Sequence, residues 1–402
     1  MSFPRVAERV RRIKPSPSTF AAERANALRR EGRSIVSLVV GEPDFDTPAH
    51  IRQAASRAME VGATRYTALA GTFELRQAIV AKLERENGLV YVPDEIIVTN
   101  GAKSAIYSAL AATLEPGDEV IIPAPYWVSY PDMVLACDGL PVPVACPENQ
   151  GFKLTSAGLD AAITKRTRWL ILNSPSNPTG ATYSAAEYRA LAEVLARHPS
   201  VLVMTDDIYE HIRFEGGTAP HLLSAAPELR DRTLAINGVS KTYAMTGWRI
   251  GWVAGPRDLV RALDTFLSQS AGNSCSISQA AAAAALTQDQ GFVAESVAIY
   301  RERRDATAAG INAIPGLSCR MPEGAFYLFV NCGGLIGRAT PDGRRLETDG
   351  DVVLYLLDSV GVAVVAGSAY GLSPYFRLSI ATSHEILADG VARIARAVAD
   401  LA

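Results

Sequence analysis

This 402-residue chain lacks the features that direct a protein to nucleic acid or to a membrane. Its 39 basic and 42 acidic side chains leave a formal net charge of only −3, so no charge excess predicts a polyanionic partner. No apolar run approaches the roughly 20 residues of a transmembrane helix, and the arginine-rich start has no apolar core of a secretory signal. We therefore expect a cytoplasmic protein with no nucleic-acid or membrane partner.

Cysteine is also scarce and irregularly placed. The five cysteines are odd in number, and they stand at positions 137, 146, 275, 319 and 332. None of these spacings is typical of a metal clip or of a disulfide framework, so we expect reduced thiols and no metal site.

What the sequence does contain is an alternation of short apolar runs and helical stretches. Seven runs are predicted to be strands: 96–99, 119–122, 140–144, 169–172, 201–205, 233–236 and 250–254. Helical stretches of about 10 to 15 residues separate most of them, a pattern that predicts a mostly parallel, doubly wound α/β sheet. Ligands of such sheets gather beyond the carboxyl ends of the strands.

The length of the chain favours two closely packed domains. We expect residues 46–300 to form a large domain, and residues 1–45 and 301–402 to form a smaller α/β domain from both chain ends. Predicted strands of the smaller domain lie at 35–40, 317–320, 326–330, 363–365 and 375–380. Other predicted helices cover 19–30, with Ser18 or Thr19 as cap, and 48–61, 72–87, 257–270, 276–286, 292–314 and 383–401. Residues 332–348, rich in glycine and charge, are expected to be a surface insertion.

The strongest chemical signal lies in the loop between the last two strands of the large sheet. Lys241 stands there among small residues, which let a backbone approach a ligand, and near aromatic side chains that would exclude water. Desolvation lowers the pKa of a lysine and makes the neutral amine available as a nucleophile. Arg249, eight positions later, offers a fork suited to a phosphate. Together they suit a Schiff-base cofactor such as pyridoxal 5′-phosphate (PLP), although most loop lysines are simply solvated.

A second signal is a buried strand that ends in two carboxylates. An unpaired buried carboxylate is unfavourable, so Asp206 requires a cationic partner, and a protonated pyridine nitrogen would serve. Tyr209 can aim its hydroxyl at the same ring. Asp207 is interpreted as a cap or a surface acid.

Three further segments follow strand ends. Gly101 and Ala102 open a predicted helix whose free N–H groups favour an anion. Lys103 lies in the first turn of this helix, where a positive charge is unfavourable, so it either is balanced by an anion or points outward. Trp127 either stacks on an aromatic cofactor or belongs to the core. Asn177 lies in the proline-rich loop 173–180, which would hold its amide against a ring oxygen and is a plausible place for a cis peptide bond.

An arginine and a glycine in the smaller domain complete the candidates. Arg377 lies in an otherwise apolar strand and therefore requires a carboxylate. A structural Asp or Glu would satisfy it, and so would a substrate α-carboxylate bound bidentately. Gly41, at the end of a predicted strand, either admits a ligand close to the backbone or is a turn residue.

The lysine loop also carries a family resemblance. The segment Ser240-Lys241-Thr242-Tyr243-Ala244-Met245-Thr246-Gly247-Trp248-Arg249-Ile250-Gly251 resembles that of class I aminotransferases, which are PLP enzymes of fold type I. The resemblance runs from Lys14-Pro15-Ser16-Pro17 to Phe376-Arg377-Leu378-Ser379 and narrows to the bacterial aspartate/prephenate aminotransferases. Gly238 departs from relatives with a serine three residues before the lysine, so Ser240 or the backbone would have to compensate at the phosphate.

The resemblance implies roles for the matching residues. Lys241 would be the catalytic residue that binds PLP, and Tyr66 would reach the cofactor phosphate of the partner subunit in a homodimer. Lys103 would meet the distal carboxylate of the substrate, with Ser16 assisting, and Lys14 would be associated with prephenate. The cofactor-binding set is Gly101, Ala102, Lys103, Trp127, Asn177, Asp206, Tyr209, Ser240, Lys241, Arg249 and Tyr66. The substrate-binding set is Gly41, Trp127, Asn177, Arg377, Lys103, Lys14 and Ser16.

The expected reaction moves an amino group between aspartate or glutamate and 2-oxoglutarate or oxaloacetate, with prephenate to arogenate as a further candidate. Aromatic or alanine aminotransferases, carbon–sulfur lyases and cyclopropane-forming synthases on the same scaffold stay open, since Lys103 favours acidic substrates without excluding others. A non-catalytic regulator is disfavoured because only about thirty residues precede the fold, too few for a DNA-binding domain. A nicotinamide dehydrogenase is disfavoured because the sequence contains no Gly-x-Gly pair.

Overall fold

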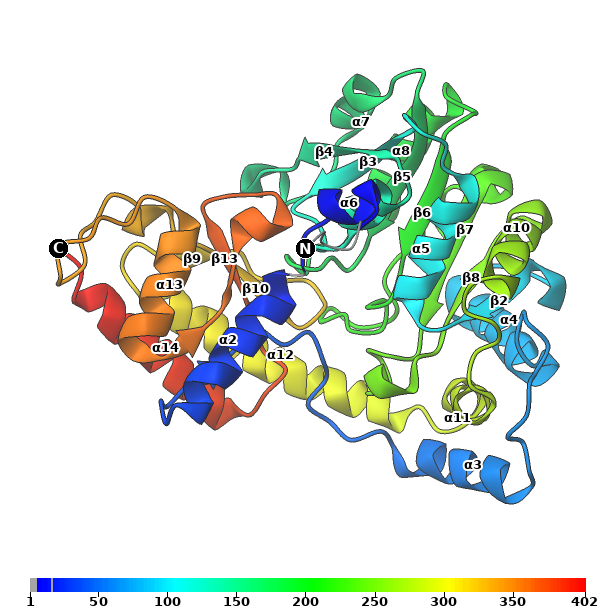
Figure 1. Ribbon diagram of the computed structural model, residues 1–402, viewed down its shortest axis with the longest axis horizontal. Helices are drawn as coiled ribbons and strands as arrows, with labels where there is room; N and C mark the ends of the chain where they lie inside the picture. Colours follow the sequence, from blue (N-terminus) through cyan, green and yellow to red (C-terminus); the bar gives the residue numbers. More distant parts are fainter. Residues whose placement is uncertain (1–5, 16) are drawn as a thin grey trace, which may run out of the picture.

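A seven-stranded sheet forms the centre of the larger part of the protein (Figure 1), in a computed structural model that describes residues 6–15 and 17–402. The strand order is β2-β8-β7-β6-β5-β3-β4. The strands are β2 (Ile96–Thr99), β3 (Glu119–Ala124), β4 (Leu140–Ala145), β5 (Thr167–Asn173), β6 (Leu202–Asp206), β7 (Thr233–Gly238) and β8 (Gly251–Ala254). Only β8 runs antiparallel to its neighbours, so the predicted, mostly parallel sheet is confirmed.

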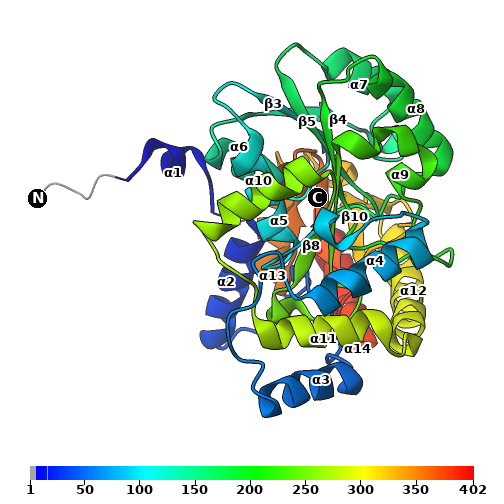
Figure 2. The ribbon, with the colours of Figure 1, turned by 90° about the vertical axis from the view of Figure 1, so that its right-hand side faces the viewer.

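Helices cover both faces of this sheet because successive strand residues point to opposite sides. Ile96 and Val98 of β2 pack in one core with α4, α8 and α11, whereas Ile97 packs in another with α5, α6 and α10. Figure 2 shows the second group on one side of the strands and α4, α8 and α9 on the other. The helices of the larger part are α3 (Ala49–Glu60), α4 (Phe73–Asn87), α5 (Ala102–Thr113), α6 (Tyr130–Ala136), α7 (Ser156–Ala162), α8 (Ala185–Ala196), α9 (Leu222–Ala225), α10 (Arg257–Ser268) and α11 (Ser276–Thr287).

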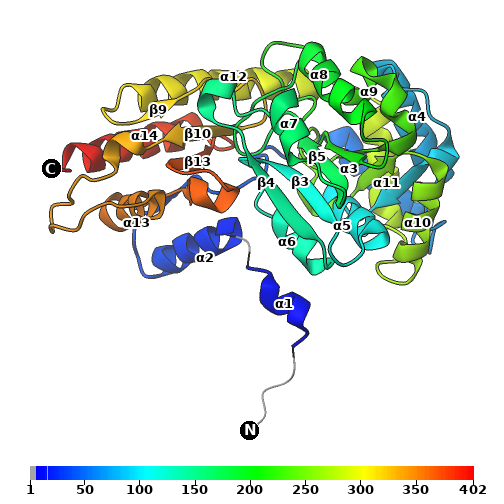
Figure 3. The same cartoon turned by 90° about the horizontal axis from the view of Figure 1, so that it is seen from above.

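The smaller part is built from both ends of the chain. Its four-stranded sheet has the order β12-β13-β10-β9, and β1 (Val36–Ser37) pairs in parallel with β11 (Val362–Ala363). The remaining strands are β9 (Ser318–Cys319), β10 (Tyr327–Asn331), β12 (Val365–Ala366) and β13 (Tyr375–Ser379); the helices are α2 (Pro17–Arg30), α12 (Gly291–Asn312), α13 (Asp349–Val360) and α14 (His384–Ala399). Helix α1 (Glu8–Arg12) precedes them and contacts α6 of the larger part. In Figure 3, α12 runs from this part towards the larger one. The limits at residues 45 and 300 stay a prediction.

Several details differ from the sequence-based expectations. Helix α13 was not predicted, although Thr348 caps it and Gly361 ends it in the left-handed conformation at φ 69°. Residues 332–348 are not a mere surface insertion, because Leu335 and Leu346 are buried. Helix α2 begins at Pro17 rather than after a Ser18 or Thr19 cap, since proline fits the first helical position.

Two predicted strands of the smaller part are also much shorter than expected. The run 35–40 contributes only β1, and the run 363–365 is divided between β11 and β12, which belong to different sheets. Among the described residues, no helix combines the length and apolar character that crossing a membrane requires.

The cap of α13 generates a stability prediction. The Thr348 hydroxyl accepts a hydrogen bond from the Asp351 N–H at 3.1 Å, and the Asp351 carboxylate accepts one from the Thr348 N–H at 2.9 Å. Replacing Thr348 by Ala should lower the free energy of unfolding by about 1 kcal/mol, measured by urea denaturation. Thr348→Ser, which keeps the hydroxyl, should unfold like the wild type; equal stability of the Ala variant would show that this cap contributes nothing.

Candidate active site

A cavity of about 380 Å³ opens beyond the carboxyl ends of the parallel strands, where the two parts of the protein meet. The core of the smaller part includes Ile208 and Tyr209 from the turn after β6, so the two parts join at this point. The predicted residues that line the cavity are Gly41, Ala102, Lys103, Trp127, Asn177, Asp206, Tyr209, Ser240, Lys241, Arg249 and Arg377.

Lys241 is partly buried and lies in the loop that follows β7. Its Nζ donates a hydrogen bond to the backbone carbonyl of Gly41, which belongs to the smaller part. Burial lowers the pKa of Lys241 to about 8, and the positive charges of Arg377 and Arg249 act in the same direction, against the opposing charge of Glu42. At pH 7 roughly a tenth of this amine is therefore neutral, far more than for an ordinary lysine.

Asp206 ends β6 and is buried. Its Oδ2 accepts a hydrogen bond from the Tyr130 hydroxyl at 2.6 Å, whereas its Oδ1, shielded from solvent, has no hydrogen-bond partner among the described residues. Burial raises the pKa of Asp206 to about 6, although the hydrogen bond from Tyr130 lowers it. A bare carboxylate oxygen in a cavity of this kind fits a cationic hydrogen-bond donor of a ligand.

The interpretation of Asp207 as a cap or surface acid is wrong. Asp207 is buried, accepts a hydrogen bond from the Thr205 hydroxyl at 2.6 Å, and lies 3.1 Å from Nε2 of His221. The neighbouring carboxylates thus differ, since Asp207 is satisfied within the protein and Asp206 is not.

The start of α5 forms a positively charged cradle. Gly101 precedes the helix with φ 86°, and a Cβ there would lie 2.5 Å from Nη2 of Arg249. Arg249, itself in the left-handed region at φ 57°, donates to the carbonyls of Thr246 and Asn100. These groups, together with the free N–H groups of the helix start, suit an anion such as a phosphate.

Lys103 forms part of the cavity wall next to this cradle. Its Nζ lies 4.8 Å from the centre of the Trp127 ring and donates to the Ser129 hydroxyl at 3.4 Å. Partial burial and the charge of Arg249 lower the pKa of Lys103. The side chain extends along the cavity rather than away from the protein, as the outward-pointing alternative would require.

Arg377 reaches the cavity from β13 and is only 2% exposed. Its Nη1 donates to Oδ1 of Asn177 at 3.0 Å and its Nη2 to the Val39 carbonyl at 2.6 Å. Among the described residues, no Asp or Glu forms an ion pair with this guanidinium, and its Nε is buried without a partner. The alternative that a structural Asp or Glu pairs with Arg377 is therefore not found among the described residues. The loop that carries Asn177 contains the cis peptide bond Ser174–Pro175.

The cavity also contains residues that the sequence analysis missed, namely Ile106, Val128, Ser129, Tyr130, Asn173, Ile208, Thr246 and Tyr327. Asn173 could have been found, because it directly follows the predicted strand 169–172. Tyr130 follows Trp127 by three residues, but nothing in the sequence links it to Asp206. Tyr327, whose hydroxyl lies 2.7 Å from that of Tyr209, comes from the smaller part and has no local signal.

Three of the predicted residues that the structure describes do not line this cavity. Gly101 lies behind it, under Arg249. Tyr66 is 97% exposed on the surface of the larger part. Lys14 is exposed, and its backbone N–H donates to Asp132 at 3.0 Å. Ser16 lies outside the described residues.

Known proteins resemble this chain over nearly its full length. A family model for aminotransferases of class I and II matches residues 33–394. An aspartate aminotransferase of Rhizobium meliloti (strain 1021) is 54% identical over 391 residues, which cover 97% of this chain and 95% of that protein. An aspartate/prephenate aminotransferase of Cereibacter sphaeroides is 52% identical over 383 residues, which cover 95% and 96%.

Solved structures agree with these sequence matches. The crystal structure of an aspartate aminotransferase from Rhizobium meliloti superimposes with a TM-score of 0.98 at 52% identity and covers 100% of both chains. That of a Thermus thermophilus aspartate aminotransferase with maleate gives a TM-score of 0.91 at 39% identity, covering 98% of this chain and 100% of the other.

The bare oxygen of Asp206 predicts that replacing this carboxylate stabilises the cofactor-free protein, and that the gain depends on pH. Because the folded-state pKa of about 6 exceeds the ordinary 3.8, the ligand-free protein should lose stability as the pH rises through this interval. Asp206→Asn should therefore stabilise the cofactor-free protein by up to about 3 kcal/mol at pH 8 and hardly at all at pH 4, measured by thermal unfolding. Asp231→Asn, at an exposed carboxylate with no ion pair among the described residues, is the control; a D206N variant no more stable than wild type at pH 8 would contradict the argument.

Proposed function

This chain belongs to the aminotransferases of class I and II, and we propose that it exchanges the amino group between aspartate or glutamate and the corresponding 2-oxo acids at the cavity around Lys241. It is a PLP-dependent transaminase of the α/β fold shared by the aspartate aminotransferases that it superimposes on. The observation that carries the proposal is the presence, in one cavity, of an amine with a lowered pKa and a buried carboxylate oxygen without a partner.

The residues of the cavity fit the chemical groups of PLP. The bare Oδ1 of Asp206 fits a protonated pyridine nitrogen, and the cradle of Arg249, Ser240 and the start of α5 fits a phosphate. Asn177 and Tyr209 would hold the ring oxygen, and Trp127 would lie against the ring. When bound, the cofactor supplies an electron sink for the electron pair at the substrate Cα.

Lys241 would perform the proton transfer. Its neutral amine would take the proton from the substrate Cα and deliver it to the cofactor carbon that receives the amino group. The Gly41 carbonyl, which accepts a hydrogen bond from Nζ, would hold the amine at the cavity wall between these steps. Arg377 would bind the α-carboxylate of the substrate, a role supported by the lack of an acidic partner within the described chain.

Preference for dicarboxylic substrates would come from Lys103. This ammonium stands on the cavity wall, beside Trp127 and Ser129, where the side-chain carboxylate of aspartate would reach it. The similarity to an aspartate aminotransferase and to an aspartate/prephenate aminotransferase supports aspartate first and prephenate as a further substrate. For prephenate, Lys14 is the candidate contact, since its backbone is anchored to Asp132 of α6, next to the cavity residue Tyr130.

A homodimer in the cytoplasm would complete the proposal. Tyr66, almost fully exposed and outside its own cavity, would reach the phosphate in the partner subunit. All five cysteines are free, which is compatible with a reducing compartment.

The role of Lys241 can be tested by substitution. Lys241→Ala should reduce transamination by about 10⁴-fold or more, because both the covalent attachment and the proton carrier are lost. The protein reconstituted with PLP should also lack the visible absorption of a lysine-bound cofactor. Lys165→Ala, at an exposed lysine, should behave like wild type; near-normal turnover of K241A with aspartate would refute the proposed chemistry.

The role of Lys103 predicts a loss that depends on the substrate. Lys103→Ala should lower kcat/KM for aspartate by about tenfold to a hundredfold, the contribution of a hydrogen bond to a charged group, while kcat/KM for alanine stays within about twofold. Lys103→Arg, which keeps the charge, should retain most of the preference. The measurement is a coupled assay over a panel of amino donors, and unchanged aspartate kinetics in K103A would assign the distal carboxylate to another residue.

A further inference from the structure

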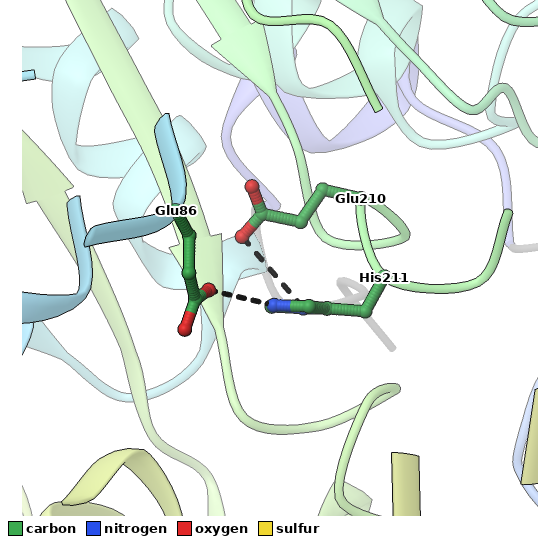
Figure 4. Close-up of side chains that lie close together, drawn as sticks. All are labelled: Glu86, Glu210 and His211. Atoms are coloured by element: carbon green, nitrogen blue, oxygen red, sulfur yellow. Dashed lines mark hydrogen bonds and ion pairs between the residues drawn. The ribbon is translucent and has the colours of Figure 1, made fainter. Parts of the chain in front are cut away.

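A buried polar network lies on the far side of the lysine loop from the cavity. Figure 4 shows its centre, where Glu86 of α4 faces the consecutive residues Glu210 and His211 of the turn after β6. Nε2 of His211 lies 2.8 Å from Oε2 of Glu86, and Nδ1 of His211 lies 3.8 Å from Oε1 of Glu210. The proposed reaction uses none of these three side chains.

The chain itself balances the charge of this network. The ligand atoms of Glu86, Glu210 and His211 lie within 4.8 Å of one another, a spacing that would suit a metal ion. Lys82, however, forms ion pairs with both carboxylates, and its side chain is only 1% exposed. The Lys82 ammonium already provides the positive charge that a metal ion would bring. We therefore explain the cluster by the hydrogen bonds that His211 and Glu210 make to other residues.

Two hydrogen bonds run from the network to the lysine loop. Nδ1 of His211 lies 3.1 Å from the hydroxyl of Thr242, the residue directly after Lys241. The amide of Asn237, at the end of β7, donates to Oε1 of Glu210 at 2.5 Å. The loop is therefore held on both sides of Lys241 by two consecutive residues.

Glu86 orients the histidine in this arrangement. A carboxylate acceptor at Nε2 places the imidazole proton there, so that Nδ1 accepts the hydrogen bond from the Thr242 hydroxyl. Burial would raise the pKa of Glu86, but the hydrogen bonds from His211 and Arg85 and the charge of Lys82 together lower it. Glu86 thus remains an ionised acceptor, and the ring is fixed between α4 and the loop.

We propose that the Glu86–His211–Thr242 chain of hydrogen bonds positions the lysine loop and thereby keeps the amine of Lys241 in place against the cavity. His211 and Glu86 are positioning residues, since neither lines the cavity. The inference rests on the proposed role of Lys241. Releasing Thr242 lets the loop move and hydrates the Lys241 nitrogen, which misplaces the reacting atom and weakens the desolvation that lowers its proton affinity.

Two variants break the same link from opposite ends. Thr242→Val removes the hydroxyl at constant shape, and His211→Gln keeps a donor for Glu86 but removes Nδ1. In the PLP-loaded protein, each should lower kcat by about tenfold and shift the pH midpoint of the visible cofactor absorption upward by about half a unit or more. The double variant should be no worse than either single one, because all three lack the same contact.

Thr242→Ser, which retains the hydroxyl, should restore both the midpoint and kcat. The matched control is His198→Gln, at a histidine paired with an exposed Asp160 elsewhere on the surface. An unchanged midpoint in folded H211Q, or losses that add up in the double variant, would overturn the proposal even if the melting temperature falls. A wild-type protein that binds no PLP would instead refute the proposed function, so the two failures are distinguishable.

Discussion

The cavity depends on ionisable groups that the fold removes from water without completing their interactions. Within the described part of the chain, Asp206 keeps one bare carboxylate oxygen, Lys241 donates a hydrogen bond only to a backbone carbonyl, and Arg377 contacts amide and carbonyl oxygens instead of a carboxylate. Each group is stabilised by a ligand of matching chemistry and destabilised without one. These groups therefore destabilise the ligand-free protein at the place where PLP and a dicarboxylic amino acid would bind.

Both parts of the protein position the residues of the cavity. The parallel strands bring Asn173, Asp206 and the lysine loop to one edge of the large sheet. The smaller part closes that edge with Gly41, Tyr327 and Arg377, and its core extends under Tyr209. Next to the loop, Glu210 and His211 contact the side chains of Asn237 and Thr242, on either side of Lys241. A ligand in the cavity would thus contact side chains that are positioned by the large sheet, by the smaller part and by the contacts of Glu210 and His211.

Local chemistry made much of this predictable. The seven strands of the large sheet lie within two residues of their apolar runs, because a buried strand needs little beyond continuous hydrophobicity. Helix α13 was not predicted, although Thr348 and Asp351 form a recognisable capping pattern at its start. The glycine-rich stretch before it suggested a surface insertion instead. Tyr327 could not be anticipated, because its contact with Tyr209 joins segments that are far apart in the chain. Asp207 and His221 are closer in the chain, but no local pattern links the two residues. Likewise, no sequence pattern around Glu86 predicts its contact with His211.

The parallel pairing of β1 with β11 has a consequence for how the molecule forms in a cell. Val36 finds its partner only at Val362, so the first segment emerges from the ribosome long before its neighbour is synthesised. At a translation rate of roughly 5 to 20 residues per second, this delay is on the order of tens of seconds. During that time the nascent large sheet can assemble, whereas the beginning of the chain stays unpaired and exposed to chaperones and proteases.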